Sequence, residues 1–432
     1  MVVLRLILAT AYLATPALVA AMVVARSVRA GSGKPAVGFL FTCVSGLLIG
    51  LGMATLYAVA VGGHVRPGQA LLTGYFAIAA LCLLKGLSAL LERGALRLVR
   101  LPHPGTAALE ANAAVPPPPR YYRTRFTTAF VLRALALYAI GLPYVMAVAM
   151  VYRPKATPAD DPHTQLGFKF EPVRFSSSDG VRLHGWWIPA PPPRPDDLKD
   201  RPDWGTRTVV LCHGLGANKS NQLVMAQDLV PAGYNVLAFD FRAHGQSGGQ
   251  FTTFGDLERH DVLGAVRWLR QARPGQSRHI YGVGASMGAA ALVAAAADEG
   301  EDGQALEALA LYGTYDDLGS LVDSVAGHYF IPPLDWLANN VGLPIASAHV
   351  GRRLGKFSPA REIAGLWPRP VLVIHGKSDR IIAFKHGQDL YDAALQPKYY
   401  YWVDRGDHND VVADPVVSKA VLLFFDNARS II

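Results

Sequence analysis

The stretch Gly282-Val-Gly-Ala-Ser286-Met-Gly288 joins two different sequence patterns. The preceding run, His279-Ile-Tyr-Gly-Val283, is typical of a buried strand, and the alanine-rich run 289–297 is typical of a helix. A G-x-S-x-G motif in this context predicts a nucleophile elbow, in which Gly284 and Gly288 avoid collisions inside a very tight turn. The turn would expose Ser286 at the carboxyl edge of a sheet, beside the positive end of a helix.

A nucleophilic serine needs a base to accept its proton and an acid to orient that base. One known chain order is serine, acid, histidine, with the acid and the histidine each following a later strand. Asp379 follows the apolar run 371–376, and His408 follows the aromatic run 399–403. We therefore predict that Ser286 is the nucleophile, His408 the base and Asp379 the acid.

Each of these assignments has an ordinary alternative. An aspartate after a strand is often the N-cap of the next helix, and His408 stands among aspartates, as in a solvated loop. Asp316 also follows a strand-like run. The competing histidines are His213, His244, His375 and His386. The joint order and placement of three residues favours the predicted set.

A glycine-flanked turn after the run 208–212 provides a candidate oxyanion hole. His213 and Gly214 form this turn, and the backbone N–H of Leu215 could donate to a developing oxyanion. The second donor would be the N–H of Met287, the residue after the nucleophile. A plain strand-to-helix turn fits the same glycines. No His or carboxylate spacing resembles a metal site, and no cofactor is expected.

The part of the chain from 165 to 432 predicts an α/β domain. Two strands, 168–175 and 181–188, flank the turn signal Ser176-Ser-Ser-Asp-Gly180. The segment 190–204 is rich in proline and aspartate and predicts a surface loop. Further strands are expected at 208–212, 235–239, 280–283, 308–312, 371–374 and 399–403, with helices at 220–232, 256–273 and 287–297. Such alternation predicts a mostly parallel sheet with helices on both faces.

These motifs together resemble the α/β-hydrolase superfamily. The loop Phe239-Asp-Phe-Arg-Ala-His-Gly-Gln-Ser-Gly248, with Gly284–Gly288, His375–Asp379 and Asp407–Asp410, is similar to a membrane-linked branch of serine hydrolases. That branch includes protein depalmitoylases and lysophospholipid lipases and is loosely related to serine aminopeptidases. The resemblance covers about 165–430. It implies the same roles for Ser286, His408 and Asp379, and it implies the substrate only poorly.

An insertion at about 314–368 precedes the strand that carries Asp379. It contains Tyr329-Phe-Ile-Pro-Pro-Leu-Asp-Trp336 and Leu343-Pro-Ile345. Such an apolar, aromatic insertion would form a helical cap that shapes an acyl pocket. Helical decoration packed on the core is the alternative interpretation.

Residues 1–155 predict a transmembrane domain of about four helices. Apolar runs at about 3–25, 38–61, 70–91 and 129–152 approach the roughly 20 residues that span a bilayer. The fourth is interrupted by Arg133 and Pro143 and could instead lie at the membrane surface. This part holds 15 Lys and Arg against 2 Asp and Glu, whereas the remainder holds 26 against 31. The basic charge therefore belongs to the membrane part, and no nucleic-acid partner is expected.

The distribution of basic residues predicts the topology. With four spans, the loops at 26–37 and 92–128 share one face and hold nine Lys and Arg, against four on the other face. Because excess Lys and Arg mark the cytoplasmic side, the α/β domain should lie outside a bacterial cell membrane, or in a lumen in a eukaryote.

The sequence thus predicts a membrane-embedded serine hydrolase that acts on a lipid or another acylated substrate, cleaving esters or thioesters. Two alternatives stay open. One is a peptidase similar to serine aminopeptidases, which would need acidic groups at the mouth of its site to hold a free amine. Asp316, Asp317, Asp323 and Asp335 are the candidates for that task. The other is a catalytically silent hydrolase fold that serves as a scaffold on a membrane anchor.

Overall fold

The computed structural model describes Leu40, Cys43, residues 142–329, Trp336, and residues 338–411 and 414–428. Contacts divide the chain into two compact units, Met1–Gly141 and Leu142–Ile432, and the elements described below belong to the second. No helix within the described ranges is long and apolar enough to cross a membrane. Apart from Leu40 and Cys43, the first three predicted spans and most of the fourth lie outside the described residues. The predicted transmembrane domain therefore stays a prediction.

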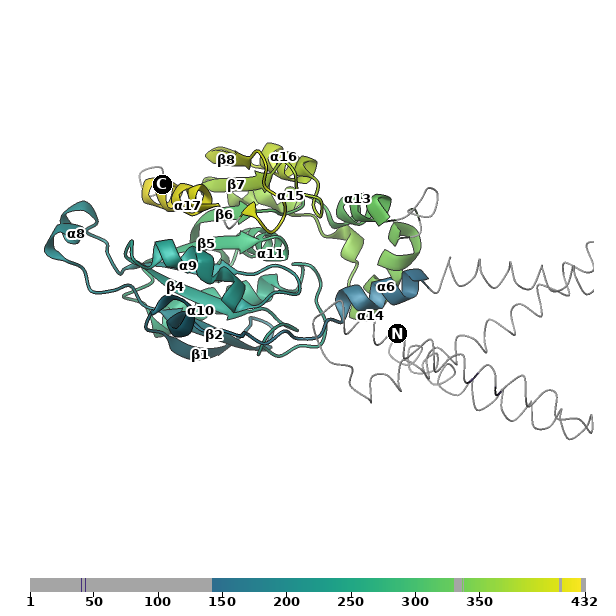
Figure 1. The fold of residues 1–432 in the computed structure, drawn as a ribbon, viewed down its shortest axis with the longest axis horizontal. Helices are drawn as coiled ribbons and strands as arrows, with labels where there is room; N and C mark the ends of the chain where they lie inside the picture. The colour runs from purple at the N-terminus through teal and green to yellow at the C-terminus, as the bar shows by residue number, and fades with distance from the viewer. Residues whose placement is uncertain are drawn as a thin grey trace, which may run out of the picture. The chain divides into compact units, whose positions relative to one another are not determined.

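A sheet in the order β1-β2-β4-β3-β5-β6-β7-β8 forms the centre of the second unit (Figure 1). The strands are β1 (Glu171–Ser176), β2 (Arg182–Ile188), β3 (Arg207–Cys212), β4 (Tyr234–Asp240), β5 (His279–Ala285), β6 (Leu306–Tyr312), β7 (Val371–Gly376) and β8 (Lys398–Val403). Strands β3 to β8 pair in parallel, whereas β1 and β2 are antiparallel. β3, β4 and β7 are buried along their whole length, as expected for apolar strands covered on both faces.

Helices cover both faces of this sheet. The helices of the described residues are α6 (Leu142–Val151), α7 (Pro162–Leu166), α8 (Pro195–Asp200), α9 (Leu223–Leu229), α10 (Arg259–Ala272), α11 (Met287–Ala296), α12 (Glu301–Gln304), α13 (Leu318–Tyr329), α14 (Leu343–Val350), α15 (Pro359–Glu362), α16 (Phe384–Ala393) and α17 (Pro415–Ala428), and not all of them lie on the sheet. Alternate residues of a strand point to opposite faces. Val210 and Cys212 of β3 therefore join the core under α10 and α11, whereas Val209 and Leu211 join the core under α9 and α17.

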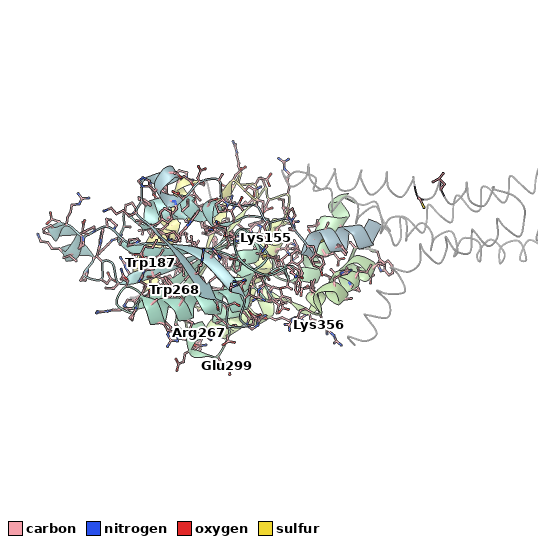
Figure 2. The ribbon with its side chains drawn as sticks, turned by 90° about the horizontal axis from the view of Figure 1, so that it is seen from below. Lys155, Trp187, Arg267, Trp268, Glu299 and Lys356 are labelled. Carbon is pink, nitrogen blue, oxygen red and sulfur yellow. The ribbon has the colours of Figure 1, made fainter. Side chains whose placement is uncertain are left out.

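The first two strands form the predicted hairpin and pack against α10. Its turn is closed by the N–H of Ser177, which donates to the carbonyl of Val181 at 2.8 Å. Trp268 of α10 contacts Phe175 and Trp187, with ring centroids 5.9 and 6.2 Å apart. Figure 2 shows Trp187 and Trp268 beside each other. The aromatic pairs fix α10 against this edge of the sheet.

The segment 190–204, predicted as a surface loop, is largely exposed, but it also contains the short helix α8, which was not predicted. Pro195 stands at the first helical position, where no N–H is needed. The carboxylate of Asp197 accepts the N–H of Arg194 at 2.7 Å, which caps the first turn. The Pro-Asp composition that suggested a loop is thus also a helix start signal.

The segment between β6 and β7 is helical and builds a third apolar cluster. It carries α13, α14 and α15, together with the short turns η3 (Ala338–Gly342), η4 (Leu354–Lys356) and η5 (Ile363–Leu366). Leu343 of α14, Val151 of α6 and Phe254 belong to one buried cluster, and α6 lies beside α14 (Figure 1). Most of the stretch Tyr329–Trp336 lies outside the described residues. The role of this cap in shaping an acyl pocket stays a prediction.

Candidate active site

Ser286 lies at the junction of β5 and α11 in a strained backbone conformation. Its φ is 50° and its ψ is −116°, a region that residues with side chains rarely adopt. A Cβ on Gly288 would lie 2.3 Å from the carbonyl oxygen of Cys212, and one on Gly284 would lie 2.6 Å from the backbone nitrogen of Ala289. Only glycine fits at either position, so the strand-turn-helix geometry predicted for the G-x-S-x-G stretch is present.

Residues at the end of β6 and just after it bond to both the N–H and the carbonyl of Ser286. The N–H of Ser286 donates to the carbonyl of Tyr312 at 2.9 Å, and the hydroxyl of Thr314 donates to the carbonyl of Ser286 at 2.9 Å. Both partners belong to the end of β6 and the residues just after it. These two bonds offset part of the strain and keep Ser286 at the carboxyl edge of the sheet.

His408 and Asp379 meet at the same edge. The loops after β7 and β8 bring His408 Nδ1 to 2.7 Å from Asp379 Oδ2. The other carboxylate oxygen of Asp379 accepts the N–H groups of Ile381 at 2.9 Å and Ile382 at 2.8 Å. Both oxygens of the carboxylate are therefore used, which fixes the orientation of the carboxylate and, through it, the imidazole.

The environment keeps Asp379 ionised. Burial alone would raise the pKa of Asp379, but its interactions with His375 and His408 outweigh that effect and hold the pKa well below its usual range. His375 Nε2 lies 3.4 Å from the same oxygen that His408 contacts. A carboxylate that accepts the proton on Nδ1 leaves Nε2 of His408 as the basic nitrogen.

Gly313 lies beside the imidazole of His408, and its importance was not predicted. It directly follows Tyr312, the partner of the Ser286 N–H. A Cβ at Gly313 would lie 3.4 Å from Cε1 of His408, and the φ of Gly313 is +55°. Among the described residues, Ser286 Oγ makes no hydrogen bond to His408, and catalytic hydrogen bonds in resting enzymes often tighten only with substrate. The only sequence signal at this position is a glycine directly after a strand.

The competing acid and histidine form a pair of their own. Asp316 Oδ1 lies 2.5 Å from Nδ1 of His386 on α16, and both side chains are largely buried. The structure therefore places Asp316 with His386, and it places Asp379 with His408.

His213 and His244 each hydrogen-bond to the loop that carries the other. Both ring nitrogens of each histidine have a partner. His213 Nδ1 lies 2.8 Å from the carbonyl of Gly214, and Nε2 accepts the N–H of Phe241 at 3.1 Å. His244 Nε2 accepts the N–H of Gly216 at 3.1 Å, and Nδ1 lies 2.8 Å from the carbonyl of Arg242. Because one nitrogen must accept, each ring is neutral and donates from Nδ1. Burial, followed by the nearby His244, lowers the pKa of His213 to about 3.

These bonds orient the candidate oxyanion donors. In a trans peptide the carbonyl and the N–H point in opposite directions, so the bond from His213 to the Gly214 carbonyl directs the Leu215 N–H away from His213. A Cβ on Gly214 would lie 3.5 Å from Cβ of Ser286, which places this turn against the elbow. The Met287 N–H belongs to the first turn of α11, where N–H groups have no acceptor within the helix. The oxyanion-hole role of Leu215 and Met287 stays a prediction.

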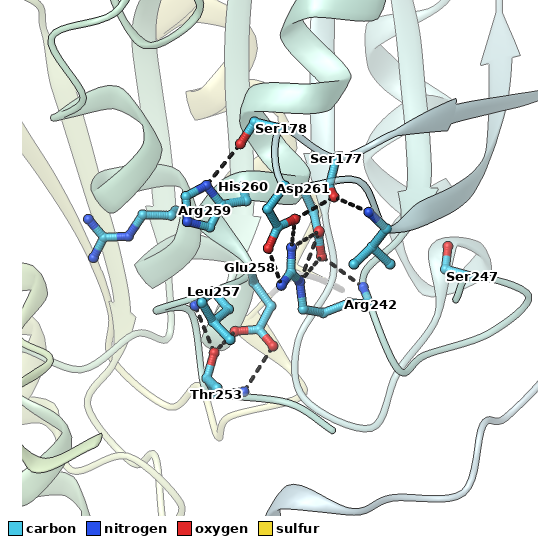
Figure 3. A network of polar contacts seen from close by, with 12 residues as sticks. Ser177, Ser178, Arg242, Ser247, Thr253, Leu257, Glu258, Arg259, His260 and Asp261 are labelled. Atoms are coloured by element: carbon cyan, nitrogen blue, oxygen red, sulfur yellow. Dashed lines mark hydrogen bonds and ion pairs between the residues drawn. The ribbon is translucent and has the colours of Figure 1, made fainter. Parts of the chain in front are cut away.

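Ion pairs hold the loop after β4, and those of Arg242 with Asp261 and of Lys219 with Asp240 are buried. Arg242 binds Asp261 and Asp179, with its Nη2 2.7 Å from a carboxylate oxygen of each (Figure 3). Lys219 Nζ lies 2.6 Å from Asp240 Oδ2, and both side chains are almost completely buried. Breaking such a buried pair is strongly destabilising, because it leaves an uncompensated charge. The sequence motif of this loop did not predict these pairings.

Three comparisons show which known proteins this chain is similar to. Residues 207–330 match the family model described as alpha/beta hydrolase fold. The uncharacterized protein YfhR of Escherichia coli O157:H7 is 27% identical over 244 residues, which are 56% of this chain and 75% of YfhR. The solved Pyrococcus furiosus esterase Pf2001 superposes with a TM-score of 0.51 and 26% identity, covering 65% of this chain and 98% of the esterase.

A more distant relative is lysophosphatidylserine lipase ABHD12 of Danio rerio. It is 24% identical over 231 residues, which are 51% of this chain and 57% of the lipase. The sheet order, the elbow and these similarities define the class: they support the α/β-hydrolase superfamily, and they support a hydrolase that is similar to esterases.

Proposed function

We propose that this protein is a membrane-anchored serine hydrolase that cleaves acyl esters or thioesters. The observation that carries the proposal is the 2.7 Å contact between His408 Nδ1 and Asp379, at the sheet edge where the strained Ser286 follows β5. Hydrolysis by serine needs these three functions in this arrangement.

The proposed reaction is acyl transfer to water in two steps. Ser286 Oγ attacks the carbonyl carbon while His408 Nε2 takes its proton, and Asp379 stabilises the imidazolium. The Leu215 and Met287 N–H groups hold the oxyanion. Collapse expels the alcohol or thiol, which receives the proton from His408 and leaves an acyl-serine. Water then attacks the acyl-serine, with His408 again as the base, and releases the carboxylic acid.

Three observations support an acyl substrate over a peptide. The cap contributes an apolar cluster that includes Leu343 and Phe357. Two acidic residues that could have held a free amine have other partners: Asp316 binds His386, and Asp317 accepts the N–H groups of Gly319 and Ser320. The names of an esterase and a lysophosphatidylserine lipase among the similar proteins support the same preference.

A labelling assay and a substrate panel test this function on the purified full-length chain. We expect covalent labelling by a fluorophosphonate probe and turnover of p-nitrophenyl acyl esters, because both need an activated serine. Aminoacyl p-nitroanilides are expected to be poor substrates. Turnover of the aminoacyl amides alone would support the peptidase. A folded protein that neither labels nor cleaves any ester would support the silent scaffold.

The membrane anchor and its topology form a separate part of the proposal. The apolar runs in 1–155 and the nine Lys and Arg on two alternate loops support an α/β domain outside the cytoplasm. We expect a phosphatase fused after Ile432 to be active in bacterial cells and a fluorescent protein fused there to stay dark. A fluorescent, phosphatase-negative result would reject the external placement and would leave the chemistry of Ser286 untouched.

A further inference from the structure

The loops that follow β7 and β8 are bonded to each other at the end of the sheet. The two strands are parallel neighbours, so both loops leave the sheet at the same edge (Figure 1). The N–H of Lys377 donates to the carbonyl of Val403 at 2.9 Å. The N–H of Ser378, one residue further on, donates to the carbonyl of Gly406 at 3.2 Å. Backbone bonds therefore join the first residues of the two loops.

Asp407 continues this connection with its side chain. Its carboxylate oxygen Oδ1 accepts the N–H of Arg380 at 3.0 Å and the N–H of His408 at 2.8 Å. Arg380 directly follows Asp379, and Asp407 directly precedes His408. One oxygen atom therefore binds the backbone of both loops at the point where the proposed acid and base lie.

The separation of the two backbones decides whether the two side chains can meet. His408 Nδ1 lies 2.7 Å from Asp379 Oδ2. The other oxygen of Asp379 accepts the N–H groups of Ile381 and Ile382, so the carboxylate is not free to follow a shift of the imidazole. Misplacing a reacting group by about 1 Å can cost on the order of 10² in rate. A small movement of the loop at Asp407 would therefore weaken the pair.

The contacts of Asp407 depend on the position of Oδ1 more than on its charge. Both donors to Oδ1 are backbone N–H groups, and an amide oxygen at the same place could accept them. The other oxygen lies 3.4 Å from Nε of Arg380, but the Arg380 side chain is 80% exposed, and exposed ion pairs stabilise little. Hydrogen bonds from the backbone of Arg380 and then of His408 lower the pKa of Asp407, so the acceptor carries no proton at neutral pH.

We propose that Asp407 is a positioning residue whose Oδ1 sets the placement of the His408 imidazole relative to the carboxylate of Asp379. This inference rests on the proposed function and adds to it a residue that acts through the base. Because Asp407 acts through His408, loss of its acceptor oxygen should lower kcat and leave KM nearly unchanged.

Three substitutions at position 407 of the full-length chain separate the position of the oxygen from its charge. The measurements are kcat and KM for p-nitrophenyl butyrate, with active sites counted by endpoint labelling with a fluorophosphonate. Asp407→Ala removes the acceptor, and we expect kcat to fall about ten- to a hundredfold with KM within about twofold of the wild type. Asp407→Asn can keep an oxygen in place without the charge and should retain most of kcat. Asp407→Glu keeps the charge, moves the oxygens by one methylene group, and should lose kcat as alanine does.

Asp404→Ala is the matched control. Asp404 belongs to the same loop and also joins the two loops, through an ion pair with Lys377 at 2.6 Å. Its side chain is exposed, and neither member of this pair is adjacent to Asp379 or His408 in the chain. The control should therefore keep the kcat of the wild type.

Several results would overturn the inference. A wild-type kcat in Asp407→Ala would do so, and so would a loss of activity that only follows the loss of labelled sites, since that would assign Asp407 to stability alone. Activity kept by glutamate and lost by asparagine would show that the charge acts instead. If alanine at 407 prevents folding, the comparison of asparagine with glutamate decides. Each of these results, with the wild type labelled, leaves the proposed function standing, whereas a wild type that neither labels nor cleaves any ester refutes both.

Discussion

Replacing Ser286 with alanine is expected to abolish both fluorophosphonate labelling and ester hydrolysis. The hydroxyl is the proposed nucleophile, and it stands on a turn whose φ of 50° exposes it at the sheet edge. Loss of a triad member in serine hydrolases typically costs on the order of 10⁴ to 10⁶ in kcat. Gel fluorescence after probe treatment and p-nitrophenyl ester turnover measure the two effects on the same preparation.

The substitution should leave the fold intact, because alanine at 286 removes one oxygen and keeps the backbone bonds to Tyr312 and Thr314. A thermal melt close to that of the wild type would verify this. Ser320→Ala, on the exposed side of α13, is the matched control and should label fully. Undiminished labelling of Ser286→Ala would mean that another residue is the nucleophile.

Asp379→Asn is expected to reduce kcat by about 10⁴, because the amide cannot stabilise the imidazolium of His408 and favours the wrong tautomer. The carboxylate oxygen that contacts His408 at 2.7 Å is replaced, whereas the oxygen that accepts the Ile381 and Ile382 N–H groups can be retained. We therefore expect kcat to fall by orders of magnitude while the melting temperature changes little. Steady-state turnover and thermal melts of the same variant separate the two.

Asp316→Asn is the matched comparison, since it changes another buried acid that follows a strand and binds a histidine. Asp316 contacts His386 on α16, so this variant should lose stability with far less effect on kcat. The opposite ranking of the two variants would show that the acid of the reaction follows β6 and that the contact between His408 and Asp379 is structural.

Much of the fold follows from local patterns in the sequence. Apolar runs of four or five residues predicted the buried strands, because a strand covered on both faces cannot alternate with polar residues. The elbow around Ser286 was predictable because its glycines are required by contacts within one strand-turn-helix unit. The segment at 195–200 was missed because proline and aspartate signal a loop and a helix start equally well.

The sequence by itself determined the strand-helix alternation, the turn that carries Ser286 and the order in which Asp379 and His408 follow it. Only the tertiary structure decided which acid meets which histidine, since both Asp316 and Asp379 follow strands. It also decided that His213 and His244 bridge two loops. These pairings depend on which strands become neighbours, and the sheet order places β4 outside β3 against the order of the chain. Contacts between residues far apart in sequence leave no local pattern, because they arise only when the strands assemble.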